Sequence, residues 1–276
     1  MRELLSQERL LVSPFTYDAF MAKIAETVGF PIVYMSGFGT AMSKGYPDEG
    51  LVSMSEMVDN ARRIANTVSV PVIADADTGY GNAINVRRTV REYEQAGVAG
   101  IHLEDQVFPK KCGFFEGKQV IPMEEHVAKV RAAVDAREDP DFLIIARSDA
   151  LAVNGWDDTI RRCRAYHEAG ADMVFVDGIK STEDLERYAH DLADAPRLYN
   201  GDLVSTQEIE RLGFKIMIHR GSMFAVYKWV RSVMEQLKSE GAVDPSLYGK
   251  REEVAELLGL DAIYEMEKEY AVAGKS

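Results

Sequence analysis

Strand-like and helix-like patterns alternate along this chain, and the alternation limits its possible folds. Eight short apolar runs suit buried strands, and each is followed by a segment with helical periodicity. Such alternation forms parallel sheets, because each helix carries the chain back to the start of the next strand. Eight units in about 240 residues predict an α/β fold, the (β/α)8 TIM barrel. The expected strands cover residues 10–13, 31–35, 71–74, 100–104, 142–147, 173–177, 197–200 and 215–219.

The segments between and after these runs extend the prediction. Residues 96–101 resemble residues 169–174, each a helix end followed by a strand, although an open doubly wound sheet also produces such echoes. We expect residues 1–240 to form a barrel catalytic domain and residues 241–276 a C-terminal helical tail that packs on the barrel or exchanges with a neighbouring subunit. The expected helices cover residues 17–28, 53–67, 83–96, 123–137, 156–169, 181–192 and 224–237, with one more beginning at Ser205.

Composition excludes several classes of partner. A net charge of -13 opposes binding to nucleic acid and to anionic membranes, so we expect a small-molecule substrate. No run approaches the ~18 apolar residues of a membrane span, and the first residues lack a signal peptide's apolar core, so a cytoplasmic protein is expected. Cys112 and Cys163 cannot build a disulfide framework.

Two carboxylates, Asp75 and Asp77, follow the third expected strand. Side chains alternate along a strand, so these two are expected to point the same way. Their like charges repel, and more strongly when buried, unless a cation lies between them. Oxygen ligands beside a loop suit Mg2+, with Mn2+ as the other possibility. In the competing interpretation one aspartate caps the next helix and the other faces solvent.

Polar side chains also follow the other expected strands, where barrel enzymes carry their active sites. Glu104 could share the metal with the aspartates, and Arg147 could bind a substrate carboxylate through two parallel hydrogen bonds. The backbone amides of residues 36–38 could hold a second carboxylate. Each residue alone is more often a loop cap or a surface charge, but their joint occurrence at the strand ends favours a site. The strand ends carry Tyr34, Ser36, Asp75, Asp77, Glu104, Asp105, Arg147, Asp149, Asp177, Asn200 and His219.

The connection after the fourth strand spans about 18 residues, a length typical of an active-site lid. Its single cysteine, Cys112, has three lysines nearby that would lower the pKa of the thiol and attract an anionic substrate. Gly113 and Gly117 could serve as hinges. A lone cysteine is more often a small buried hydrophobic residue, which is the role we expect for Cys163.

Five motifs together resemble the isocitrate lyase and phosphoenolpyruvate mutase superfamily, in order over residues 9–240: YMSG at 34–37, DADTGYG at 75–81, HLEDQ at 102–106, KKCG at 110–113 and IARSD at 145–149. The resemblance implies a (β/α)8 barrel that exchanges its eighth helix between subunits, usually in a homotetramer built as a dimer of dimers. It also implies Mg2+ and an α-keto or α-hydroxy acid substrate.

Site residues carried over by this resemblance fall into three groups. Metal binding is implied for Asp75 directly and, through water, for Asp48, Asp77 and Glu104. Substrate binding is implied for Ser36, Gly37, Phe38, Asp75, Lys111, Gly113, Asp177 and Asn200. Catalysis is implied for Tyr34 as proton acceptor, Arg147 on the substrate and Cys112 as the lyase cysteine that protonates the departing enolate.

The expected reaction is cleavage of a carbon-carbon bond in a 2-hydroxy di- or tricarboxylic acid, giving an α-keto acid such as pyruvate and a carboxylic acid. Two departures from the lyase pattern concern the second product: Phe114 replaces a histidine, and Asp177 stands where methylisocitrate lyases tend to have glutamate. They favour a 2-alkylmalate or 2,3-dimethylmalate, with 2-methylisocitrate as competitor.

Other activities stay open. A carbon-phosphorus mutase, including one that resembles carboxyphosphonoenolpyruvate mutase, or a phosphonopyruvate hydrolase would keep the metal site without needing the thiol. An oxaloacetate decarboxylase would also need only the metal and an enolate. A barrel that serves only as a scaffold would gain nothing from unpaired buried carboxylates.

Overall fold

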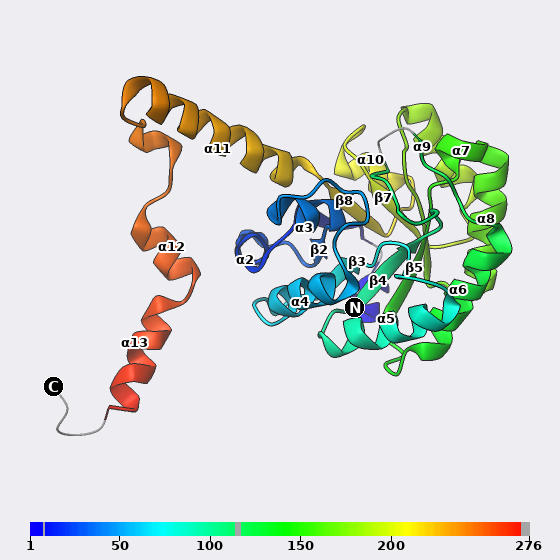
Figure 1. Cartoon of the computed structure of the whole chain (residues 1–276), viewed down its shortest axis with the longest axis horizontal. Coiled ribbons are helices and arrows are strands. Elements are labelled where there is room, and N and C mark those ends of the chain that lie inside the picture. The colour runs from blue at the N-terminus through cyan, green and yellow to red at the C-terminus, as the bar shows by residue number, and fades with distance from the viewer. Residues whose placement is uncertain (8, 114–116, 272–276) are drawn as a thin grey trace. The chain divides into compact units, whose positions relative to one another are not determined.

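The protein is described by a computed structural model that covers residues 1–7, 9–113 and 117–271. It divides into two compact units, Met1–Met223 and Phe224–Ser276. The first unit contains all the strands of the described chain, with helices around them (Figure 1).

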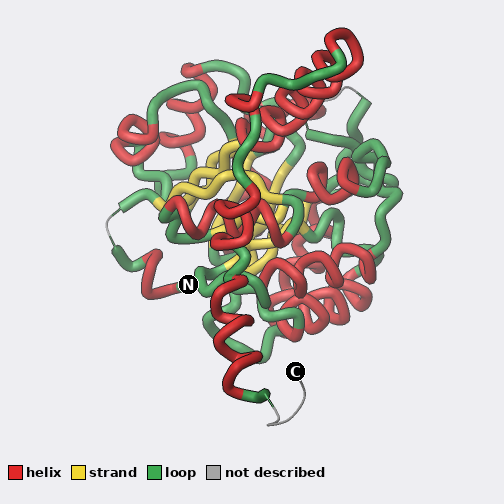
Figure 2. Tube along the Cα trace, turned by 90° about the vertical axis from the view of Figure 1, so that its left-hand side faces the viewer, coloured by secondary structure: helices red, strands yellow, loops and turns green. Residues whose placement is uncertain are grey.

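The first unit is a closed barrel of eight parallel strands in sequence order, so the predicted (β/α)8 fold is confirmed. β1 closes the barrel against β8, with Leu11 opposite Ile216. Figure 2 shows the strands gathered inside a layer of helices. The strands are β1 (Leu11–Thr16), β2 (Val33–Met35), β3 (Val72–Asp75), β4 (Gly100–Glu104), β5 (Leu143–Ser148), β6 (Met173–Val176), β7 (Arg197–Asn200) and β8 (Ile216–His219).

The helices of this unit begin where capping residues stand in the sequence. Ser53 and Glu56 form the capping box that starts α4, because each side chain accepts the other residue's backbone N–H. Asp18, Asn82, Ser181 and Ser205 cap their helices similarly. The helices are α1 (Arg2–Leu5), α2 (Ala19–Val28), α3 (Gly37–Ser43), α4 (Met54–Ala65), α5 (Ala83–Gln95), α6 (Met123–Ala136), α7 (Leu151–Asn154), α8 (Trp156–Glu168), α9 (Thr182–Asp191) and α10 (Thr206–Arg211).

Alternation along the strands builds two layers of core. In β5, Leu143 and Ile145 pack with inward-facing residues of the other strands inside the barrel. Ile144 and Ala146 point the other way and pack in clusters that include residues of the surrounding helices. Because both faces of each strand are covered, the strands read as near-continuous apolar runs. This packing holds the strand ends, and the polar residues on them, in fixed positions.

Three short helices of the first unit were not predicted: α1, α3 and α7. The sequence of α3 contains Gly37 and Gly39, which lower helix propensity. A Cβ on Gly39 would lie 2.7 Å from Tyr17 Cβ, so a side chain there has no room. Close packing and the Ser36 cap therefore stabilise a helix that the sequence pattern does not predict.

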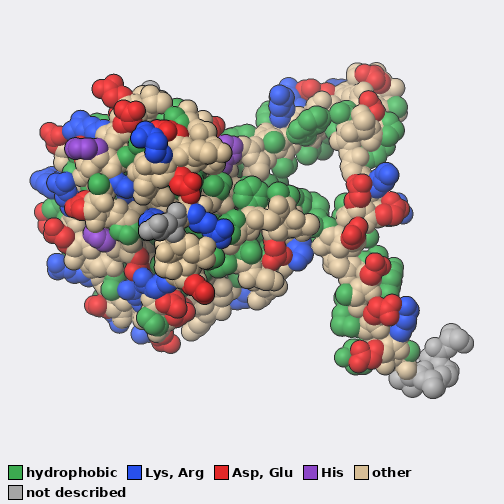
Figure 3. Space-filling view, turned by 180° about the vertical axis from the view of Figure 1, so that it is seen from behind, with side chains coloured by type: hydrophobic (Ala, Val, Ile, Leu, Met, Phe, Trp, Pro, Cys, Tyr) green, Lys and Arg blue, Asp and Glu red, His purple; other side chains and the backbone are tan. Residues whose placement is uncertain are grey.

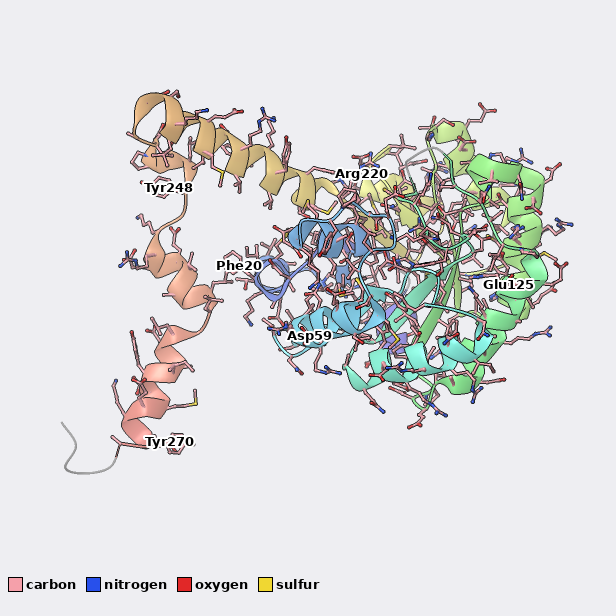
Figure 4. All side chains as sticks on the ribbon, viewed as in Figure 1. Phe20, Asp59, Glu125, Arg220, Tyr248 and Tyr270 are labelled. Atoms are coloured by element: carbon pink, nitrogen blue, oxygen red, sulfur yellow. The ribbon has the colours of Figure 1, made fainter. Side chains whose placement is uncertain are left out.

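The second unit contains only helical elements among its described residues. These are most of α11 (Gly221–Glu240), a 3-10 turn at Pro245–Leu247, α12 (Arg251–Leu257) and α13 (Leu260–Glu269). Figure 3 shows hydrophobic side chains on the surface of these helices, and Figure 4 shows Tyr248 and Tyr270 projecting outward. Across the described chain, no helix is both long and apolar enough to cross a membrane.

Candidate active site

Buried polar side chains collect at the carboxyl ends of the strands, as the sequence predicted. Tyr34, Asp75, Glu104 and Arg147 lie on β2, β3, β4 and β5, and Asn200 ends β7. Asp177 directly follows β6, while Asp48 and Asp77 come from loops. All eight side chains are buried, at 8% exposure or less. Contacts between neighbouring strand ends link most of them into one site.

Asp75 and Asp77 come together through a turn and not through strand alternation. β3 ends at Asp75, and Asp77 has a φ of 46°, in the left-handed region that few residues other than glycine adopt. The Asp77 N–H donates to Asp75 Oδ1 at 3.0 Å, and the Gly37 N–H donates to Asp75 Oδ2 at 3.1 Å. The expected proximity is therefore present, but the reason given for it from the sequence was wrong.

Lys110 lies between two of the carboxylates that were expected to hold metal-bound water. Its Nζ is 2.8 Å from Asp77 Oδ1 and donates a hydrogen bond to Asp48. The lysine is 3% exposed, so the ion pairs compensate for its burial. Lys110 was expected to act on the Cys112 thiol; its position instead joins the loops that carry Asp48 and Asp77.

Glu104 is a buried carboxylate that lacks compensating hydrogen bonds. Within the described part of the chain, neither of its oxygens accepts a hydrogen bond. The guanidinium Nη2 of Arg147 lies 3.3 Å from Glu104 Oε2. Burial raises the pKa of Glu104 well above its usual range, although Arg147 and Lys110 oppose the shift. A further cation near these oxygens would favour the charged form.

Arg147 is held by protein carboxylates on two sides. Its Nε and Nη2 donate to Asp149 at 2.9 and 3.1 Å, and Nη2 also donates to Asp177 at 3.0 Å. The guanidinium lies over the ring of Phe175, 5.3 Å from its centroid. Asp149 thus occupies the two-pronged face of the guanidinium that was expected to bind a substrate carboxylate.

Tyr34 forms a buried pair with a histidine that the sequence interpretation assigned no role. Its hydroxyl lies 2.8 Å from His102 Nε2, which in turn is 3.5 Å from Asp75 Oδ1. Burial raises the pKa of Tyr34 well above 10. The sequence could have indicated that His102 faces the site, because it lies two residues from Glu104 on the same face of β4.

The arm of the β4–α6 loop that carries Cys112 lies against the site. Cys112 is a half-buried thiol, and a Cβ on the next residue, Gly113, would lie only 1.6 Å from Asp177 Oδ2. The backbone of Lys111 exchanges two hydrogen bonds with the Gln106 side chain, and the Lys111 ammonium lies beside Gly117. Phe114, on which the substrate prediction partly depends, lies outside the described residues.

Four other predicted positions take more local roles. Ser36 Oγ caps α3 by accepting the Gly39 N–H, so residues 36–38 begin a helix instead of forming only a turn. Asn200 Nδ2 donates to Asp177 Oδ1 at 3.1 Å. His219 Nδ1 accepts the Gly221 N–H, and Asp105 accepts hydrogen bonds from Ser148 and Tyr166, so these two bind their own surroundings.

The charge balance of the site suits a divalent cation. Among the described residues, five of six buried carboxylates pair with the three buried cations Lys110, Lys118 and Arg147, and the sixth, Asp75, pairs with none of these cations. Glu104 has no hydrogen bond of its own in the described structure. No three carboxylate, histidine or thiol groups of the described residues converge tightly enough to hold a metal by themselves. An ion that keeps several waters, as Mg2+ does, fits this donor set better than zinc. The six carboxylates are Asp48, Asp75, Asp77, Glu104, Asp149 and Asp177.

A closed (β/α)8 barrel with acidic side chains at its carboxyl-terminal face has the architecture of an enzyme that acts on a small polar substrate. Residues 1–238 match the phosphoenolpyruvate phosphomutase family model, and the chain belongs to that family. This confirms the phosphoenolpyruvate mutase and isocitrate lyase superfamily predicted from the motifs. Members of the superfamily use a divalent metal, Mg2+ in a solved example.

Individual relatives are similar over almost the whole chain. A 2,3-dimethylmalate lyase of Eubacterium barkeri is 44% identical over 282 residues, covering 98% of this chain and 97% of the relative. A 2-methylisocitrate lyase of Aeropyrum pernix is 40% identical over 270 residues, covering 94% and 86%. The structure of oxaloacetate acetylhydrolase with 3,3-difluorooxalacetate has a TM-score of 0.93 at 36% identity, covering 99% and 97%. The two lyases support the predicted enzyme class.

Proposed function

We propose that the protein is a Mg2+-dependent lyase that cleaves a 2-hydroxy di- or tricarboxylic acid, of the 2,3-dimethylmalate or 2-methylisocitrate type, into an α-keto acid and a carboxylic acid. One observation carries the proposal: the loop segment that bears Cys112 packs directly on Arg147 and Asp177 through Gly113. A thiol therefore borders the residues expected to bind the second product.

Substrate binding is assigned to polar groups at the carboxyl ends of the strands. The guanidinium of Arg147 would bind one carboxylate of the substrate. By resemblance, the backbone at Ser36, Gly37 and Phe38 would hold the pyruvyl carboxylate in place of the bonds that the Ser36 and Gly37 N–H groups now donate to the Thr16 carbonyl and Asp75 Oδ2. Asn200 Oδ1 is buried without a hydrogen bond from the described residues, so it can accept one from a substrate hydroxyl or a protonated acid. These contacts would orient the bond to be broken across the site.

A Mg2+ ion would be held by Asp75 and, through water, by Asp48, Asp77 and Glu104, and when bound it would stabilise negative charge on the substrate's oxygens. Tyr34 takes the proton of the substrate hydroxyl and passes its own to His102 Nε2, 2.8 Å away. The adjacent carbon-carbon bond then breaks, its electrons remain on the departing acid as an enolate, and the keto acid forms. The Cys112 thiol protonates that enolate carbon.

The proposed substrate preference rests on Asp177 and on the similarity of the chain to a 2,3-dimethylmalate lyase. Asp177 is shorter than the glutamate common in methylisocitrate lyases, and it already binds Arg147 and Asn200. A dicarboxylate with an alkyl branch needs fewer polar partners there than a tricarboxylate does. The 44% identity to a 2,3-dimethylmalate lyase supports the same choice.

The test is pyruvate release, measured with a coupled dehydrogenase, from 2,3-dimethylmalate, 2-methylisocitrate, isocitrate, oxaloacetate and phosphonopyruvate. For the last two, oxalate, acetate and phosphate are measured as well. Each reaction is run with Mg2+ and with a chelator. The proposal predicts Mg2+-dependent release that is fastest from the branched 2-hydroxy dicarboxylate. Turnover of oxaloacetate or phosphonopyruvate alone would overturn the lyase assignment.

Oxaloacetate is included because a specific observation favours it: the oxaloacetate acetylhydrolase structure matches with a TM-score of 0.93. Hydrolysis of oxaloacetate to oxalate and acetate would use the same acidic site. It requires an attacking water, and the departing acetate carbanion takes a proton as the lyase product does, so the products, oxalate and acetate instead of pyruvate, separate it from the proposed lyase reaction.

We also propose a homotetramer, arranged as a dimer of dimers with helix exchange. The resemblance implies this assembly, and the second unit carries large apolar side chains that are about half exposed, as an interface between subunits requires. Light scattering of the purified protein should give four times the chain mass, and a monomer would contradict the proposal. The exposed side chains include Tyr227, Trp229, Met234, Leu237, Ile263 and Tyr264.

A further inference from the structure

Lys118 is a buried cation that the proposed reaction does not use, and from the sequence it counted only as one of three lysines near Cys112. It lies on the arm of the β4–α6 loop that returns toward α6, and its side chain is 2% exposed. An ammonium group this deeply buried costs free energy unless it is paired and hydrogen-bonded. The chain therefore places it there against a specific set of partners.

Those partners connect the loop to the barrel. Lys118 Nζ is 3.0 Å from Asp149 Oδ1, just beyond β5, and it also donates to the backbone carbonyl of Gly113 on the outgoing arm of the loop. Asp149 is the same carboxylate that holds Arg147 through two hydrogen bonds. One side chain thus joins both arms of the loop to the arginine of the site.

Gly113 is packed so tightly that its position has little freedom. A Cβ there would lie 1.6 Å from Asp177 Oδ2 and 2.6 Å from Arg147 Nη2. On another side, the position of a Cβ on Gly178 is 3.8 Å from the Gly113 carbonyl and 3.9 Å from Lys118 Nζ. Since Cys112 precedes Gly113, whatever holds the Gly113 carbonyl also holds the thiol-bearing residue.

We propose that Lys118 is a positioning residue: it binds the Gly113 carbonyl and Asp149 together and so keeps Cys112 at the Arg147–Asp177 pair. The assignment of Cys112 as the acid rests on the proposed function, whereas the positioning itself does not. A purely structural ion pair would stabilise the fold without controlling the accessibility of this thiol. The two roles can therefore be separated by measuring the thiol.

The experiment measures the rate at which iodoacetamide alkylates Cys112 in the full-length protein, followed by mass spectrometry of the peptide. Lys118→Met should accelerate alkylation roughly 10- to 100-fold, the range expected for loss of one hydrogen bond to a charged group. Lys118→Arg, which keeps the charge, should lie nearer the wild type. Lys44→Met, at an exposed lysine, serves as the matched control and should leave the rate unchanged.

Cys163 provides an internal check on folding, because it is fully buried and stays unmodified while the barrel is intact. If Lys118→Met exposes Cys163, Lys118→Gln replaces it and the same acceleration is expected. A wild-type alkylation rate at Cys112 in either folded variant would overturn the proposal. With an active substrate, kcat should fall while KM changes little; if no lyase activity exists, the alkylation result still decides the positioning role.

Discussion

Replacing Arg147 by methionine tests how the site is held together. Methionine keeps much of the arginine's apolar length but removes three hydrogen bonds to Asp149 and Asp177 and the cation 3.3 Å from Glu104. Asp149 keeps Lys118, and Asp177 keeps Asn200, so the loss is partly compensated. Removing one partner of a buried ion pair costs about 3–5 kcal/mol; with this compensation we expect Arg147→Met to lower the free energy of unfolding by about 3 kcal/mol, the lower end of that range, at pH 7.5.

The effect should depend on pH in a definite direction. Burial alone would raise the pKa of Asp149, but Arg147 and Lys118 outweigh it and hold that pKa well below the usual range. A lowered pKa stabilises the folded protein at pH above the unfolded value of about 3.9, and this contribution is lost as the pH falls toward the folded pKa. Without Arg147 the buried carboxylates take up protons at higher pH, so the deficit should be smaller at pH 5.5 than at pH 7.5.

Urea unfolding followed by far-ultraviolet circular dichroism at the two pH values measures both effects. Arg63→Met is the matched control, since Arg63 forms an exposed pair with Asp59 on α4. The reasoning is refuted if Arg147→Met is no less stable than Arg63→Met. It is also refuted if the deficit grows as the pH falls.

Two further predictions concern the acidic site. Burial raises the pKa of Glu104, so its charge destabilises the metal-free protein increasingly as the pH rises. Glu104→Gln should therefore be more stable than wild type at pH 8, and the difference in stability should be smaller near pH 5. The variant should also show a smaller rise in melting temperature when Mg2+ is added. An unchanged Mg2+ response would exclude Glu104 from the metal site. Tyr34→Phe removes the hydroxyl bonded to His102, so kcat should fall at least tenfold while stability changes by roughly 1 kcal/mol. Unchanged turnover would remove Tyr34 from the reaction.

The barrel could be predicted from the sequence because its signal is local and repeated. Each strand is covered on both faces, so β5 reads as an apolar run that ends in the polar pair Arg147 and Ser148. Once the runs are ordered as parallel strands, their carboxyl ends must lie at the same end of the barrel. This placed Asp75, Glu104 and Arg147 in one site. The short helix α3 was not predicted, because its stability comes from packing between Gly39 and Tyr17.

The pairing of charges could not be predicted, because it depends on distances between segments that are remote in sequence. Lys110 meets Asp48 from 62 positions away, and Lys118 meets Asp149 from 31. Sequence reasoning placed both lysines near Cys112, which is true along the chain but does not describe where their ammonium groups lie. Asp77 likewise reaches Lys110 through a left-handed backbone conformation that strand alternation does not anticipate.

The most direct test of the proposed function compares wild type, Cys112→Ser and Cys163→Ser for Mg2+-dependent pyruvate release from 2,3-dimethylmalate. Because serine is a much weaker acid than cysteine, the account predicts that kcat collapses in Cys112→Ser, while Cys163→Ser, at a buried position of α8 with no proposed role in the reaction, keeps turnover near wild type. Equal turnover by Cys112→Ser and wild type, or turnover indifferent to Mg2+, would contradict it.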